Sequence, residues 1–170
     1  MENPISNTQQ TTALSGKDVF TVLGTLIQFL SIPAQNRDDI AVMMGCIPSG
    51  VVIPLHSHAD PEIFYILEGR IDVYEGHQNT WRSVAAGDVL TIPGDVTHAL
   101  RNNSTSMVKA ILVSKKNIYS FFRELARPVT ADGIQTPDPK EILAFLQAAE
   151  NYDYWLGSPE ENAAIGIALR

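Results

Sequence analysis

Apolar and polar residues alternate in short runs between residues 50 and 115, and glycine or proline ends most of these runs. Successive side chains of a β-strand point to opposite faces, so this alternation predicts strands with one buried face. Strands are expected at 51–57, 62–68, 70–75, 80–83, 88–92, 97–102 and 107–113. Many short strands between Gly and Pro turns are typical of an antiparallel sandwich or barrel, so the predicted fold class is mainly β.

The segments before residue 50 are less regular. The apolar positions within 18–30 fit either a short helix or two barrel strands, and their periodicity does not decide between the two. The apolar run 40–46 is expected to form a strand that is buried on both faces. Residues 1–16 are rich in Thr, Gln, Ser and Asn, which predicts a flexible N-terminal tail.

A helical pattern follows residue 115. Apolar residues recur at helical spacing and form an amphipathic stripe at Ile118, Phe121, Phe122 and Leu125. The segments 138–141 and 158–161 each begin with a capping residue, then proline, and end with glutamate, which is the signature of a helix start. We therefore expect a β-barrel at 17–115, followed at 116–170 by a C-terminal extension of three short helices packed on the barrel.

Composition narrows the class of protein. The chain has 170 residues, 45% of them hydrophobic, which suits one domain with a sizeable core. A formal net charge of −7 makes nucleic acid and anionic membranes poor partners. The single cysteine, Cys46, lies in an apolar run and is expected to be a buried, inert thiol. Neither a signal peptide nor a membrane-spanning run is apparent, so we expect a soluble, cytoplasmic protein.

Three of the four histidines lie in the predicted β region and suggest a metal site. His56 and His58 are two residues apart, so on a strand they share one face, with Cα atoms about 6.5–7 Å apart. The turn at 60–61 returns the chain and brings Glu62 beside them, and His98 must come from a distant strand. Imidazole nitrogens converging in this way can bind one ion.

Each of these residues also has an ordinary explanation. A lone histidine is more often a surface or core residue than a ligand, and Glu62 alone could be a surface carboxylate. His77, within the polar turn at 75–79, fits that explanation and is given no role. The joint occurrence of three histidines and one glutamate, framed by glycines, favours a metal site over separate structural roles.

The first of the two segments resembles motif 1 of the cupin superfamily. The motif is Gly, five residues, His-x-His, three or four residues, Glu, six residues and Gly. Its specified positions are matched by Gly50, His56, His58, Glu62 and Gly69.

The second segment is similar to cupin motif 2. Gly87, Pro93, His98 and Asn102 occupy its specified positions, but Asp95 stands where the motif has its second glycine. This departure leaves the shape of that turn open without changing the position of His98. The resemblance to both motifs covers about residues 40–115.

The resemblance implies a cupin double-stranded β-helix, a jelly-roll barrel with the metal inside. It also implies that His56, His58, Glu62 and His98 are the metal ligands, and that the protein is a homodimer. The segment 121–125 resembles bacterial single-domain cupins described as quercetin-dioxygenase-like. A helix there could shape the pocket entrance, but packing on the outer face of a sheet is the more favoured expectation.

Three imidazoles and one carboxylate suit one divalent transition metal: Fe, Mn, Ni, Cu or Zn. The first functional hypothesis is a dioxygenase-type oxidoreductase that takes a small aromatic or enol-bearing substrate on the metal. Glu62 could remain a ligand or act as the catalytic base. The apolar walls that bind the substrate are expected to include Phe64, Ile66 and Leu100.

Two other functions stay open. The metal could act as a Lewis acid in an isomerase or lyase, including a decarboxylase. Alternatively, the barrel could bind a small ligand without catalysis. No helix-turn-helix signature is apparent and the C-terminal segments are acidic, so DNA binding is not expected.

Overall fold

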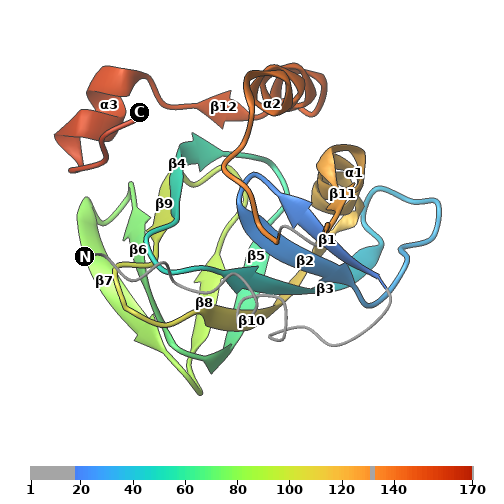
Figure 1. Cartoon of the computed structure of the whole chain (residues 1–170), viewed down its shortest axis with the longest axis horizontal. Helices are drawn as coiled ribbons and strands as arrows, with labels where there is room; N and C mark the ends of the chain where they lie inside the picture. Colours follow the sequence, from blue (N-terminus) through green and yellow to red (C-terminus); the bar gives the residue numbers. More distant parts are fainter. Residues whose placement is uncertain (1–17, 131–132, 170) are drawn as a thin grey trace.

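The computed structural model describes residues 18–130 and 133–169, which form two antiparallel sheets facing each other (Figure 1). The larger sheet has the order β11 (Arg127–Pro128), β1 (Val19–Val22), β2 (Thr25–Phe29), β3 (Ile40–Ile47), β10 (Val108–Lys115), β5 (Glu62–Glu68) and β8 (Val89–Ile92). The smaller sheet has the order β12 (Trp155–Leu156), β4 (Val52–Ser57), β9 (His98–Arg101), β6 (Arg70–Glu75) and β7 (Thr80–Ala85). The mainly β, jelly-roll fold class is confirmed.

The structure settles the form of segment 18–30, which the sequence left open, and corrects the expected burial of the strand at 40–46. The segment 18–30 forms two strands, β1 and β2, joined by a tight turn at Leu23 and Gly24, which both have positive φ. Strand β3 alternates between buried and half-buried residues, and Ile40 is exposed, so the expectation of burial on both faces was wrong. Half of the residues of β3 remain partly accessible among the described part of the chain.

The core between the sheets consists of side chains from both. Ile66, Leu90 and Val108 of the larger sheet meet Val73 and Leu100 of the smaller one, and all five are almost fully buried. Burying side chains of this size contributes about 1.5–3 kcal/mol each. This core fills one part of the barrel, and a cavity occupies the part nearer the helices.

The three expected helices are α1 (Lys116–Leu125), α2 (Pro139–Asn151) and α3 (Pro159–Ala164). Helices α1 and α2 cover one end of the larger sheet (Figure 1), where Phe121 packs on Met43 and Leu112 in a second apolar cluster. Asp138 and Ser158 each form the predicted capping box at the start of α2 and α3. No helix in the described residues is both long and apolar enough to cross a membrane.

The C-terminal extension also contributes two short strands, which the sequence did not predict. Strand β11 pairs with β1, and β12 pairs with β4 so that Trp155 lies opposite Ser57. The indole of Trp81 on β7 donates a hydrogen bond to the carbonyl of Ile165 (2.9 Å), and Arg101 lies over the same indole at 3.8 Å. The last 15 described residues are therefore fastened to the smaller sheet at both of its edges. The expected tail at 1–16 lies outside the described residues.

Candidate metal centre

The histidines and Glu62 come together at one end of the barrel because of the strand pairing. His56 lies near the end of β4 and is paired with His98, the first residue of β9. His58 follows β4 directly, and Glu62 is the first residue of β5. The ring centroids of His56 and His98 are 4.2 Å apart, and those of His58 and His98 are 5.1 Å apart. One ligand nitrogen from each ring lies within 4.8 Å of the others.

All three rings are oriented by the same kind of hydrogen bond. Nδ1 of His56 lies 2.7 Å from the carbonyl oxygen of Pro54, and Nδ1 of His98 lies 2.8 Å from that of Val96. Nδ1 of His58 contacts the carbonyl of Asp60 at 2.8 Å. A carbonyl can only accept, so Nδ1 carries the proton and the neutral ring leaves Nε2 free. Partners of this kind fix the tautomer that a metal ligand needs.

Glu62 contacts two of the three histidines. Its Oε2 lies 3.2 Å from Nε2 of His98 and 3.7 Å from Nε2 of His58. Both Oε2 of Glu62 and Nε2 of His98 are buried and form no hydrogen bond. A buried polar atom without a partner costs about 1–3 kcal/mol, and a cation placed between these atoms would remove that cost. These atoms therefore fit a bound metal ion, although the role of each predicted ligand stays a prediction.

The electrostatics favour a neutral His56 beside an ionised Glu62. Burial, with a smaller contribution from the neighbouring His98 and His58, lowers the pKa of His56 to about 3. Burial opposes the ionisation of Glu62, but the close imidazoles of His58 and His98 outweigh it and hold the pKa of Glu62 well below its usual range. Burial also opposes the charged form of His58, but Glu62 outweighs it and raises the pKa of His58.

A β-bulge precedes His56, and the C-terminal segment completes its hydrogen bonds. The pairing of β4 with β9 shifts between Ile53 and His56. The backbone N–H of Leu55 there donates to Oδ1 of Asn162 (2.9 Å), and the carbonyl of Leu55 accepts from the N–H of Gly157 (2.8 Å). Asn162 is fully buried, and its Nδ2 donates to the carbonyls of Gly157 and Ser158. No sequence signal identified Asn162 as a support of the site.

Asp95, the residue that departs from cupin motif 2, lies in a turn with a left-handed backbone. Asp95 adopts φ +63°, a conformation that glycine favours and that aspartate tolerates better than most residues. Its N–H donates to the carbonyl of His58 (2.8 Å), which ties this turn to the loop that carries His58. At Gly94 a Cβ atom would overlap the carbonyl oxygen of Ala59, so only glycine fits there. The two motifs are thus in direct backbone contact.

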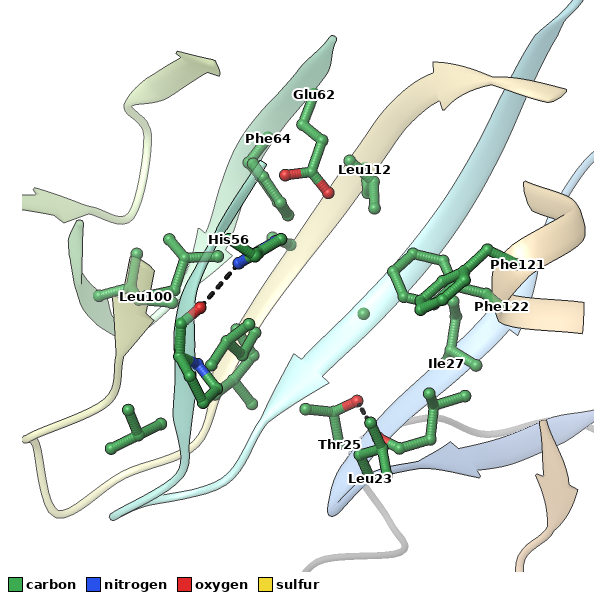
Figure 2. Close-up of a pocket in the computed structure, with 18 of the residues that line it drawn as sticks. Leu23, Thr25, Ile27, His56, Glu62, Phe64, Leu100, Leu112, Phe121 and Phe122 are labelled. Carbon is green, nitrogen blue, oxygen red and sulfur yellow. Dashed lines mark hydrogen bonds between the residues drawn. The ribbon is translucent and has the colours of Figure 1, made fainter. Parts of the chain in front are cut away.

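A cavity of about 360 Å³ opens from the histidine cluster into the barrel, a volume that suits a small molecule (Figure 2). His56, His58 and Glu62 lie in its wall, as do the three predicted substrate-binding residues Phe64, Ile66 and Leu100.

Helix α1 contributes Phe121 and Phe122 to this wall (Figure 2), so the favoured expectation that this helix only packs on an outer sheet face was wrong. The apolar stripe of α1 packs on Met43 and Leu112, and these two residues also line the cavity.

Tyr154 is a member of the site that the sequence did not reveal. Its ring lies 4.8 Å from that of His58 and is stacked on Phe121 at 4.2 Å. Burial and the nearby carboxylates of Glu62 and Asp60 raise the pKa of Tyr154 well above 10, so the phenol stays protonated at neutral pH. The residue lies between α2 and β12, in a segment with no metal-binding motif, and only tertiary packing brings it to the cavity.

Two residues of the sequence analysis lie elsewhere. His77 is exposed in the turn between β6 and β7, as expected. Asn102 is fully buried but does not line the cavity. Its Nδ2 donates to the carbonyls of Ile47 and Ser106, and its Oδ1 accepts from Ser104, so it joins two loops at the other end of β9. Its position in motif 2 therefore has a structural role here.

The chain was compared with known proteins by sequence and by fold. Residues 43–114 match the family model described as the cupin domain, and no curated protein matches the chain in sequence. The Schizosaccharomyces pombe Cnp3 cupin domain has a similar fold, with a TM-score of 0.50 and 17% identity over 63% of this chain and 74% of that domain.

Two enzymes are more distantly similar in fold. The polyketide cyclase RemF from Streptomyces resistomycificus has a TM-score of 0.49 and 18% identity, over 55% of this chain and 66% of the cyclase. The DMSP lyase DddQ from Ruegeria pomeroyi DSS-3 has a TM-score of 0.46 and 21% identity, over 58% of this chain and 47% of the lyase. The chain thus spans about two thirds of the cyclase and less than half of the lyase. The family-model match and the two-sheet fold together support the placement of this chain in the cupin superfamily.

Proposed function

We propose that the chain is a metal-dependent oxidoreductase of the dioxygenase type, similar to quercetin 2,3-dioxygenases, that acts on a small aromatic or enol-bearing substrate. The observation that supports this proposal is the convergence of three imidazole nitrogens and one ionised carboxylate at the end of an apolar cavity. Such donors suit divalent Fe, Mn, Ni, Cu or Zn. An ion of this class supplies Lewis acidity and, where it is redox-active, electrons for oxygen chemistry.

Each part of the site has a separate task in this proposal. His56, His58 and His98 would hold the ion through Nε2, with their rings fixed by the backbone carbonyls. The apolar walls would exclude water and orient the body of the substrate. The substrate's own oxygen atom would direct it toward the histidine end.

Glu62 is assigned as a ligand first. Its carboxylate holds its charge strongly, and a carboxylate with a lowered pKa is a poor proton acceptor at neutral pH. A role as catalytic base requires that its interactions with His58 and His98 weaken when the ion is bound. The variant Glu62→Gln separates the two roles, because the loss of a ligand lowers metal affinity, whereas the loss of a base alone lowers only the turnover rate.

A second candidate function is Lewis-acid chemistry in an isomerase or lyase. The observation in its favour is Tyr154, which lines the cavity with its ring near His58 and whose protonated hydroxyl forms no hydrogen bond within the described residues. A phenol in this position could donate a proton to a substrate. Dioxygenase chemistry has no obvious need for it.

The first test is the metal content of freshly purified protein, measured by mass spectrometry. We expect near-stoichiometric transition metal in the wild-type protein and its loss in His98→Ala, because Nε2 of His98 is buried and unpaired. The matched control is His77→Ala, which removes an exposed histidine from a turn and should retain the metal. Absence of metal from the wild-type protein, even after reconstitution, would contradict the assigned site and leave a ligand-binding barrel.

The second test separates the two enzyme functions. Protein loaded with iron, manganese, nickel or copper is supplied with flavonols, catechols and 1,3-diketones while dissolved oxygen is monitored. Consumption of oxygen that disappears in His98→Ala supports the dioxygenase proposal. If zinc-loaded protein converts a substrate equally fast without consuming oxygen, the Lewis-acid function replaces it.

A further inference from the structure

The cavity offers no positive charge to a substrate. Among the described residues, its lining includes neither lysine nor arginine, and its polar members are Thr25, Cys46, His56, His58, Glu62 and Tyr154. The last four gather at the histidine end. The Thr25 hydroxyl already donates to the carbonyl of Val22 (2.7 Å), and burial raises the pKa of the Cys46 thiol to about 11, so neither provides a charge.

The end of the cavity away from Glu62 is lined by the turn between β1 and β2, where Leu23 and Thr25 lie (Figure 2). Leu23 has φ 48° and is followed by Gly24 with φ 83°. Two-residue turns of this shape favour Asn-Gly, because most side chains are strained in the left-handed region. The strained position nevertheless holds a leucine whose side chain lines the cavity and packs on the apolar cluster beneath α1. Strain kept in this way is common at ligand-binding positions.

We propose that the site takes a substrate with one metal-binding oxygen group and an otherwise uncharged, apolar body that extends from the histidine end to Leu23. The inference rests on the proposed metal site and adds the substrate class to it. A second ionised group on the substrate would lie among aliphatic and aromatic side chains with no cation to pair with, and burying such a charge is strongly unfavourable. Dicarboxylates and phosphorylated sugars are therefore excluded, and Leu23 sets the length that the cavity accepts.

The test uses hydroxamic acids, which bind divalent metals through their oxygen atoms. Alkyl hydroxamic acids of two to ten carbons are titrated calorimetrically into metal-loaded protein. We expect the affinity to rise about fourfold per added methylene until the chain reaches Leu23. Suberic acid monohydroxamate is the matched probe for octanohydroxamic acid, since it has the same length but ends in a carboxylate. It should bind no more tightly than acetohydroxamic acid.

The variant Leu23→Asn places the residue preferred by this turn at the strained position, so the variant should fold. It should lose at least tenfold in affinity for octanohydroxamic acid and bind acetohydroxamic acid as the wild type does. Leu143→Asn is the matched control, because Leu143 is 67% exposed and does not line the cavity.

Acetohydroxamic acid binding with no gain from a longer chain, or equal binding of the carboxylate-tipped probe, would overturn this inference while leaving the metal site intact. Failure of every hydroxamate to bind would instead overturn the proposed metal site. The neutral fluorophore N-phenyl-1-naphthylamine tests the apolar chamber separately in metal-free protein. Weaker binding of it by Leu23→Asn than by Leu143→Asn supports the inference.

Discussion

Asn162 is predicted to stabilise both the fold and the metal end of the barrel, although it lies 107 residues from the backbone that it supports. The substitution Asn162→Ala removes one acceptor from the N–H of Leu55 and two donors from the carbonyls of Gly157 and Ser158. Leu55 is buried, so its N–H is left without water, at a cost of about 1–3 kcal/mol, and each lost donor adds about 0.5–1.5 kcal/mol. The three contributions overlap, and we expect a loss of about 2–4 kcal/mol.

The free energy of unfolding is measured by urea denaturation of the metal-free protein, followed by circular dichroism. Asn103→Ala is the matched control, because Asn103 is exposed and makes one long hydrogen bond, to Asp72 (3.3 Å). The control should change stability by less than about 0.5 kcal/mol.

Metal affinity provides the second measurement. The bulge at Leu55 directly precedes His56. Loss of the Asn162 side chain that supports this bulge should displace the imidazole of His56 and weaken metal binding by about 10–100-fold, the usual effect of removing a residue that supports a metal ligand. An unchanged denaturation midpoint would refute the stability argument. A lower midpoint with unchanged metal affinity would show that the bulge does not position His56.

Three further predictions concern the motif residues. Glu62→Gln should lower the pKa of His58, since Glu62 is what raises it, and an NMR titration of the metal-free protein would detect no shift if this attribution is wrong. Metal affinity should fall about tenfold per pH unit once the pH drops below the raised pKa of His58, because the protonated ring must lose its proton to bind an ion. His56, with a pKa of about 3, is already neutral in this range. Calorimetry in buffers of different ionisation enthalpy counts the released protons, and zero would contradict the assignment. Asp95→Gly should stabilise the protein by about 0.5–1 kcal/mol, because glycine adopts the left-handed backbone at φ +63° without strain. A lower midpoint of thermal unfolding in this variant would show that the aspartate side chain stabilises the fold.

The sequence was most informative where the pattern is local. Strand alternation and the two capping boxes depend on neighbouring residues, and the structure shows strands and helix starts where they were predicted. The histidine cluster could also be predicted, since the spacing of His56 and His58 puts both near one point and motif 2 supplies His98. The resemblance gave the topology that alternation alone could not.

The remaining features depend on contacts between distant segments. Tyr154 and Asn162 reach the metal end only because β12 pairs with β4, and a two-residue strand leaves no periodic signal. Phe121 belongs to an amphipathic stripe, but the stripe does not say whether the surface that it meets is solid core or a cavity wall. Leu23 escaped notice because leucine is an unexpected residue in a tight turn with positive φ.

The fastening of the C-terminal segment to the smaller sheet has a spectroscopic consequence. The chain has two tryptophans, and both lie along the seam between the C-terminal segment and the smaller sheet. Trp155 lies on β12 beside β4, and Trp81 on β7 is hydrogen-bonded to the carbonyl of Ile165. Native tryptophan emission therefore reports on the environment of the seam and carries little signal from the larger sheet. Detachment of the last residues would change the emission while the circular dichroism of the strands stays constant. The protein thus contains its own optical reporter for the opening of the segment that holds Tyr154 against the cavity.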